Sequence, residues 1–303
     1  MNQRGEFAVT AEIGPPRGAN IAPIRRKAAL LRDWLDAANV TDNQSAVVRL
    51  ATWAGCLVVM QEGVEPVMQL QCRDRNRIAL QSDLLGAAAM RIPNVLLLTG
   101  DHPRFGDHPD AKPVFDMDSI DLIWTARTMR EQRKLLSGRE LKPPPDWFIG
   151  AVENPFAPPF EWRPERLGKK VAAGAQFFQT QFIYDIPIFT RFMQKVHDFG
   201  FDRKAFILAG VGPIKSLRAL EFMRGEVPGM YVPDDVVRRL RGVPGDKVAA
   251  EGLKLCSEII QQVREIPGVA GVHVMAVNWE EAIPEILEGA GLARRAVAAG
   301  ERE

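Results

Sequence analysis

Cysteine and histidine are scarce in this chain. It has 3 cysteines and 4 histidines among 303 residues. Cys56, Cys72 and Cys256 are odd in number and show no paired spacing, so neither a disulfide framework nor a cysteine-rich metal site is expected. This usage is typical of a reducing compartment, and we expect a cytoplasmic protein.

The histidines do not form a recognisable motif. His102 and His108 lie in one loop segment without a partner at metal-ligand spacing, and we predict no metal site. His197 and His273 fall within predicted elements, where a structural role is expected. Neither a Gly-x-Ser-x-Gly motif nor a Cys/His catalytic pair is present.

Long apolar runs and a surplus of one charge are also lacking. No segment approaches the roughly 18 apolar residues of a membrane span, and the amino terminus has no apolar signal-peptide core. Lys and Arg number 39 and Asp and Glu number 38, a net charge of +1. We therefore expect neither a membrane span nor a nucleic-acid partner.

The chain does contain a regular alternation of strand and helix patterns. Apolar runs without strict two-residue alternation are typical of strands buried on both faces of a parallel sheet. The predicted strands are 6–13, 37–41, 65–71, 94–99, 146–152, 177–183, 205–211 and 269–277. Helical patterns between them include 22–37, 74–90, 118–136, 164–173, 186–199, 216–224 and 246–265, with Asp74 and Asp118 as predicted N-caps. Eight such repeats favour a closed (β/α)8 TIM barrel, as a single domain over residues 1–303.

Polar residues stand where these strands end. Glu12 follows an apolar run and precedes Gly14-Pro15-Pro16, and a carboxylate at that place is costly unless it is solvated, paired or used. The other strand ends carry Thr41, Asp42, Gln69, Gln71, Thr99, Gly100, Asp101, Glu153, Asn154, Gln181, Gly210 and Asn278. In a barrel they would meet at one mouth, where two carboxylates, Glu12 and Asp101, and several amides suit a neutral hydrogen-bonding ligand and one acid step. Alternatively, such residues simply face water, which is the favoured interpretation for any one of them alone.

Two connections, 100–109 and 153–160, are longer than a barrel needs and would lie at the same mouth. Arg166, Lys169 and Lys170 follow the second and could bind a phosphate, or form a solvated helix face. Gly210-Val211-Gly212 could likewise approach a phosphate, although a tight turn is the favoured interpretation.

The chain resembles the methylenetetrahydrofolate reductase family over about residues 6–290, most closely its short, acetogen-like bacterial form. The resemblance depends on the order and spacing of six segments. They are Thr10-Ala11-Glu12-Ile13-Gly14-Pro15-Pro16-Arg17, Val40-Thr41-Asp42, Gln69-Leu70-Gln71-Cys72, Leu98-Thr99-Gly100-Asp101-His102-Pro103, Lys169-Lys170-Val171-Ala172-Ala173-Gly174-Ala175 and Gln179-Thr180-Gln181-Phe182-Ile183-Tyr184-Asp185.

The resemblance implies a flavin-dependent barrel enzyme that reduces 5,10-methylenetetrahydrofolate to 5-methyltetrahydrofolate in one-carbon metabolism. It implies that Glu12 is the general acid, that Asp101 lies beside flavin and pterin, and that Gln181 binds folate. Leu217 and Met275 fall on further substrate-binding positions. The implied flavin-binding positions are Thr41, Gln69, Thr99, Gly100, Asp101, Phe115, Asp116, Ala151, Val152, Arg166, Lys169 and Lys170. FAD is the expected cofactor, with FMN as the alternative.

Several positions depart from the family pattern. Gln69 stands in place of a His, Thr99 in place of an Arg, and Val152 in place of an aromatic residue. Leu217 and Met275 replace aromatic residues that would pack on a nicotinamide cofactor or folate. The electron donor therefore stays open between NADH, a ferredoxin-type protein and a partner subunit, and an oligomer is expected.

Two other functions remain open from the sequence. One is a flavin-free barrel that transfers a methyl group from a pterin. The other is a flavin- or folate-binding subunit that is active only with a partner.

Overall fold

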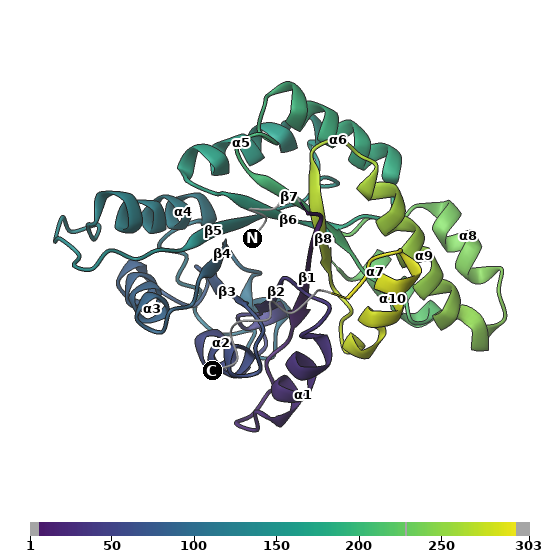
Figure 1. The fold of residues 1–303 in the computed structure, drawn as a ribbon, viewed down its shortest axis with the longest axis horizontal. Helices are drawn as coiled ribbons and strands as arrows, with labels where there is room; N and C mark the ends of the chain where they lie inside the picture. The colour runs from purple at the N-terminus through teal and green to yellow at the C-terminus, as the bar shows by residue number, and fades with distance from the viewer. Residues whose placement is uncertain (1–5, 228, 295–303) are drawn as a thin grey trace.

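The computed structural model describes residues 6–227 and 229–294, and it contains a closed barrel of eight parallel strands in chain order (Figure 1). The strands are β1 (Ala8–Ile13), β2 (Ala37–Val40), β3 (Pro66–Gln71), β4 (Asn94–Leu98), β5 (Phe148–Glu153), β6 (Phe177–Phe182), β7 (Phe206–Val211) and β8 (Val269–Val274). All eight overlap the predicted strands, and the predicted (β/α)8 barrel is confirmed.

Helices surround the barrel (Figure 1). They are α1 (Ala22–Leu31), α2 (Thr52–Gln61), α3 (Arg77–Ala89), α4 (Ser119–Arg127), α5 (Arg163–Ala173), α6 (Ile186–Asp198), α7 (Leu217–Gly225), α8 (Asp234–Arg241), α9 (Val248–Arg264) and α10 (Ile283–Gly289). Among the described residues, none of these helices is long and apolar enough to cross a bilayer.

One predicted helix cap is confirmed and one is wrong. Asp118 caps α4, where its side chain accepts hydrogen bonds from the backbone N–H groups of Ile120 and Asp121. Asn76, rather than Asp74, caps α3. Asp74 instead pairs with Arg73 at 2.8 Å, and this local ion pair removes it from the helix terminus.

The interior of the barrel changes from apolar to polar along its axis. An apolar cluster closes the amino-terminal end, and its buried residues are Ala8, Ala37, Val67, Leu96, Phe177 and Leu208. Gly150 leaves room for the Phe177 ring, since a Cβ there would lie 2.2 Å from it. The larger apolar core lies between the strands and the helices.

A polar layer follows two residues further along the strands, as the two-residue period of a strand requires. Asn39 donates a hydrogen bond to Gln179 at 2.6 Å, and Gln179 donates to Thr10 Oγ1 at 3.3 Å. Thr10 Oγ1 lies 2.9 Å from His273 Nδ1. This buried network forms a rigid polar floor beneath the carboxyl-terminal mouth.

Candidate active site

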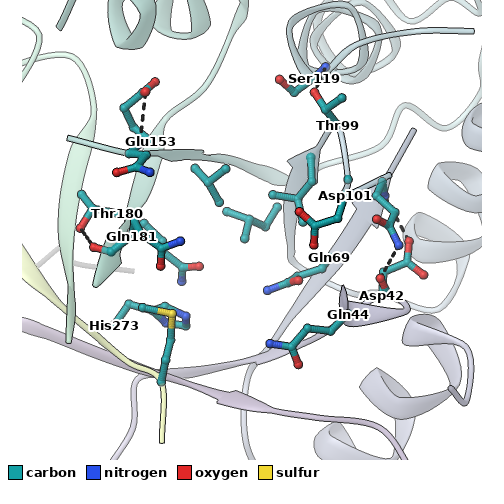
Figure 2. A pocket seen from close by; sticks show the side chains of 18 of the residues that line it. Asp42, Gln44, Gln69, Thr99, Asp101, Ser119, Glu153, Thr180, Gln181 and His273 are labelled. Atoms are coloured by element: carbon teal, nitrogen blue, oxygen red, sulfur yellow. Dashed lines mark hydrogen bonds between the residues drawn. The ribbon is translucent and has the colours of Figure 1, made fainter. Parts of the chain in front are cut away.

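A cavity of about 400 Å³ opens above this floor, at the carboxyl ends of the strands. Figure 2 shows Gln181 and His273 on one side of it, with Gln44, Gln69 and Asp101 on the other. Two residues beyond Thr10, Gln179 and His273 of the polar floor, the chain supplies Glu12, Gln181 and Met275 to the cavity lining. The volume is that of a pocket for a small organic ligand or cofactor ring.

Glu12 lies one residue before the end of β1, on the wall of this cavity. Its Oε1 accepts a hydrogen bond from Gln69 Nε2 at 3.4 Å, and its Oε2 accepts one from Gln44 Nε2 at 3.4 Å. His273 Nε2 lies 3.8 Å from Oε1. These contacts are long, so they orient the carboxylate without saturating its oxygens.

Asp101 lies on the rim, where it is exposed and lines the cavity. The preceding Gly100 has φ +92°, and a Cβ there would lie 2.3 Å from Gln71 Oε1. Gln71 also donates a hydrogen bond to the backbone oxygen of Asp42. The turn that carries Asp101 therefore depends on a glycine with a left-handed backbone.

The basic residues of α5 differ in their surroundings. Lys170 is buried, and its Nζ lies 3.0 Å from Glu153 Oε2 and donates to the Val152 backbone oxygen at 2.5 Å. Burial lowers the pKa of Lys170, and the Glu153 charge opposes that shift. Lys169 is exposed over the Trp162 ring and lies outside the cavity lining.

Arg166 is the basic residue of α5 best placed for an anion. It lines the cavity, and its guanidinium lies 5.7 Å from the centre of the Trp162 ring. Within the ranges that the structure describes, no carboxylate forms an ion pair with it. The cluster predicted as one phosphate site is thus a buried ion pair, an exposed lysine and a cavity-lining arginine.

The cavity brings together most, but not all, of the predicted site residues. Those that line it are Glu12, Gln69, Thr99, Gly100, Asp101, Val152, Arg166, Lys170, Gln181 and Met275. The others, Thr41, Phe115, Asp116, Ala151, Lys169 and Leu217, lie outside its lining. The roles that the resemblance implies for each group stay predictions.

Each residue outside the lining has an identifiable place. The Ala151 side chain packs in the core between strands and helices, and Leu217 begins α7. Asp116 binds Arg77 at 2.8 Å, and the Phe115 ring lies 6.5 Å from the His102 ring. Thr41 is fully buried, and its Oγ1 has no hydrogen-bond partner among the described residues.

Sequence reasoning missed Gln44, Gln179 and Arg163 as cavity residues and assigned His273 a structural role. The two-residue period of a strand could have identified Gln179 and His273 as cavity residues. Gln179 and Gln181 are two residues apart on β6, so both side chains face the interior of the barrel. His273 and Met275 have the same spacing along β8 and its extension, and both line the cavity. Gln44 lies in an irregular segment and Arg163 depends on tertiary packing, so no periodic pattern identifies them.

The three cysteines and the metal-binding residue types add no further site. Cys56, Cys72 and Cys256 are all buried and free, and burial raises the pKa of the Cys72 thiol to about 12. In the described part of the chain, no group of three His, Cys, Asp or Glu side chains is placed to hold a metal ion.

A closed barrel with a polar cavity at the carboxyl ends of its strands is the arrangement of a (β/α)8 enzyme. The family model described as methylenetetrahydrofolate reductase matches residues 1–291, and the chain belongs to that family.

Curated relatives agree with this assignment. Methylenetetrahydrofolate reductase 2 of Schizosaccharomyces pombe is 27% identical over 243 residues, covering 74% of this chain and 35% of that protein. A probable methylenetetrahydrofolate reductase (NADPH) of Caenorhabditis elegans is 24% identical over 237 residues, covering 76% of this chain and 33% of that protein. The chain thus spans about a third of the length of these relatives.

The fold also recurs in solved structures. An uncharacterized Clostridium thermocellum protein that binds two copies of 5-methyl-5,6,7,8-tetrahydrofolic acid superimposes with a TM-score of 0.68 at 13% identity. The match covers 94% of this chain and 96% of that one. At this identity the likeness shows the fold alone.

Proposed function

We propose that this protein reduces 5,10-methylenetetrahydrofolate to 5-methyltetrahydrofolate with a bound flavin. The observation that carries the proposal is the placement of Glu12, which presents a carboxylate to the cavity between the amides of Gln44 and Gln69. Family membership supports the folate substrate. The flavin follows from the resemblance, and the residues of this cavity must therefore fit it.

The cavity fits a flavin in three respects. Gln69 and Gln181 offer amide donors and acceptors for a ring edge, and Leu96 and Leu98 offer apolar surface for a ring face. Gly100 lines the cavity with backbone atoms alone, which a ring can approach. Arg166 supplies a cation in the cavity wall that would hold the phosphate end. When bound, the flavin supplies hydride to the methylene carbon of the substrate.

Glu12 is the proposed proton donor to the folate nitrogen that leaves as the five-membered ring opens. Gln44 and Gln69 hold the two oxygens of its carboxylate, and His273 supports it from the polar floor. Gln181 and Asp101, on opposite sides of the cavity, are proposed to bind the edge of the pterin (Figure 2). The buried network of Thr10, Asn39 and Gln179 keeps this floor fixed during the reaction.

The absorption spectrum of the purified protein, followed by anaerobic mixing of photoreduced protein with methylenetetrahydrofolate, tests the proposal. We expect a flavin absorption band in the visible range. The band should disappear on photoreduction and return when methylenetetrahydrofolate is mixed in. A colourless protein that does not bind added FAD or FMN would contradict the proposal and favour the flavin-free methyl-transfer barrel.

Three finer expectations belong to the same proposal. We expect FAD rather than FMN, a cytoplasmic location and an oligomer. A flavin that is reoxidised only after addition of another protein would favour the alternative of a subunit completed by its partner.

A further inference from the structure

A second cavity of about 170 Å³ lies beside the first. Glu12 and Gln44 line both cavities, so the two share a wall at the proposed proton donor. The other walls of this side cavity come from the loop that follows β1, from α1, from the segment between β2 and α2 that carries Arg49, and from the residues after β8. A ligand whose reacting end meets Glu12 can therefore extend into it.

Arg49 is the unsatisfied charge of the side cavity. Its Nη1 donates to the Pro15 backbone oxygen at 2.9 Å, and its backbone N–H donates to Asn43 Oδ1 at 3.0 Å, so the residue is fixed in place. Its Nε is shielded from solvent and has no acceptor among the described residues. Burial, and then the charge of Arg17, lower the pKa of Arg49, and Asp107 acts in the opposite direction.

The second cation of the side cavity is already neutralised. Lys27 Nζ lies 2.5 Å from Glu280 Oε1, and the two side chains are 17% and 6% exposed. A guanidinium stays ionised in a protein, so a partly desolvated arginine without an acceptor at Nε is stabilised by any anion that reaches it. Of the two cations, Arg49 is therefore the one that calls for an anionic ligand.

We propose that the side cavity binds a carboxylate of the folate tail through Arg49, with the pterin end of the same molecule against Glu12. The inference rests on the proposed function and names its substrate class, tetrahydrofolates with a free carboxylate on the tail. A guanidinium matches a carboxylate because its N–H groups form a planar fork. Arg49 then acts as a specificity residue, distant from the bond that is reduced.

Binding of two ligands to the flavin-loaded protein tests this inference. The probes are 5-methyltetrahydrofolate and its diamide, in which both tail carboxylates are converted to amides, measured by calorimetry. A hydrogen bond to a charged group predicts about 10–100-fold weaker binding of the diamide. In Arg49→Gln, folate affinity should fall by a similar factor and the preference over the diamide should disappear. Arg26→Gln, which removes an exposed charge of α1 outside the cavity, is the matched control and should keep the preference.

The outcomes separate this inference from the function on which it rests. Equal affinity of wild type for folate and diamide would overturn it, and this comparison holds even where Arg49→Gln does not fold. Loss of flavin from Arg49→Gln would also overturn it, since the arginine would then hold a cofactor phosphate. Failure of both ligands to bind wild type would instead contradict the proposed function, and the inference with it.

Discussion

The acidic side chains near the carboxyl ends of β1 and β5, Glu12 and Glu153, have different surroundings, and the difference decides which is left to face a ligand. Glu153 lies 3.0 Å from Lys170 and 3.8 Å from Arg163, and it is committed to these cations. Glu12 has two amides and His273 as its polar neighbours. The Glu153 carboxylate is therefore occupied by its ion pairs, whereas the Glu12 carboxylate is left to face a ligand in the cavity.

Glu12→Gln is expected to keep flavin and folate binding and to lose most of the reduction. The amide preserves the shape of the side chain and removes its proton, and general acid catalysis is worth about 10²–10⁴-fold. Reoxidation of the photoreduced protein by methylenetetrahydrofolate, followed by stopped flow, should slow by that factor. Near-normal reoxidation would remove Glu12 from the mechanism.

Lys170→Met is expected to reduce stability rather than simply weaken phosphate binding. Lys170 and Glu153 have side chains that are 4% and 1% exposed, so the substitution leaves Glu153 buried without its nearest cation. Removing one partner of such a pair costs about 3–5 kcal/mol, and Arg163 should hold the loss near the lower end. Urea denaturation measures the change, and the double variant with Glu153→Gln should recover part of it.

The exposed neighbour provides the control for this substitution. Lys169→Met should leave the free energy of unfolding within about 0.5 kcal/mol of wild type. If Lys169→Met destabilises the protein as much as Lys170→Met, the buried pair is not the cause.

At the scale of elements, the turn after β4 shapes the mouth. Gly100→Ala is expected to be costly for two reasons, because Gly100 has φ +92° and a Cβ would lie 2.3 Å from Gln71 Oε1. Gly138 has φ +86°, and a Cβ at that position would have no neighbour within 4 Å, so Gly138→Ala isolates the backbone strain. Overpacking adds about 1–3 kcal/mol, and Gly100→Ala should lose that much more unfolding free energy than Gly138→Ala. Equal losses in urea denaturation would show that Gln71 moves aside freely.

The loop before α4 is tied to α3 by Asp116 and Arg77, and this tie depends on pH. Hydrogen bonds from Arg77 lower the pKa of Asp116 to about 2. The folded pKa lies below the ordinary value, so the stabilisation is present above about pH 4 and is lost as the pH falls through about 2. Carbonyl chemical shifts should give an Asp116 midpoint near 2 in wild type, and Arg77→Gln should raise it toward about 3.9. An unchanged midpoint in the variant would show that Arg77 is not the cause.

The sequence predicted the elements of this fold better than the side-chain contacts of the site. Strands buried on both faces have a local pattern, and polar strand ends such as Glu12 and Gln181 converge once the barrel closes. Asp116 and Lys170 have residue types suited to ligand binding, but their partners Arg77 and Glu153 lie far away in the chain. Whether a charge is free for a ligand depends on such tertiary partners, which neither periodicity nor spacing encodes.

At the scale of the whole molecule, the electron donor is the open half of the reaction. The matched relatives include proteins named for NADPH and for NADH, and this chain spans about a third of their length. Met275 lines the cavity where the resemblance places an aromatic ring, and Leu217 begins α7 outside the lining. Loss of one aromatic contact removes about 0.5–1.5 kcal/mol, so a folded nicotinamide cofactor lacks part of its stacking surface here.

We therefore expect the two half-reactions of the isolated protein to separate. Reduction of the flavin by NADH should be slow or absent, because the stacking positions are aliphatic. Reoxidation by methylenetetrahydrofolate should be competent, because Glu12, Asp101 and Gln181 all line the cavity. Stopped-flow bleaching of the flavin by NADH measures the first step, and dithionite reduction serves as the control that the flavin accepts electrons. Rapid, saturable bleaching at micromolar NADH would show that the aromatic positions are dispensable, whereas the expected split places the physiological electrons with a partner protein that docks near the mouth of the barrel.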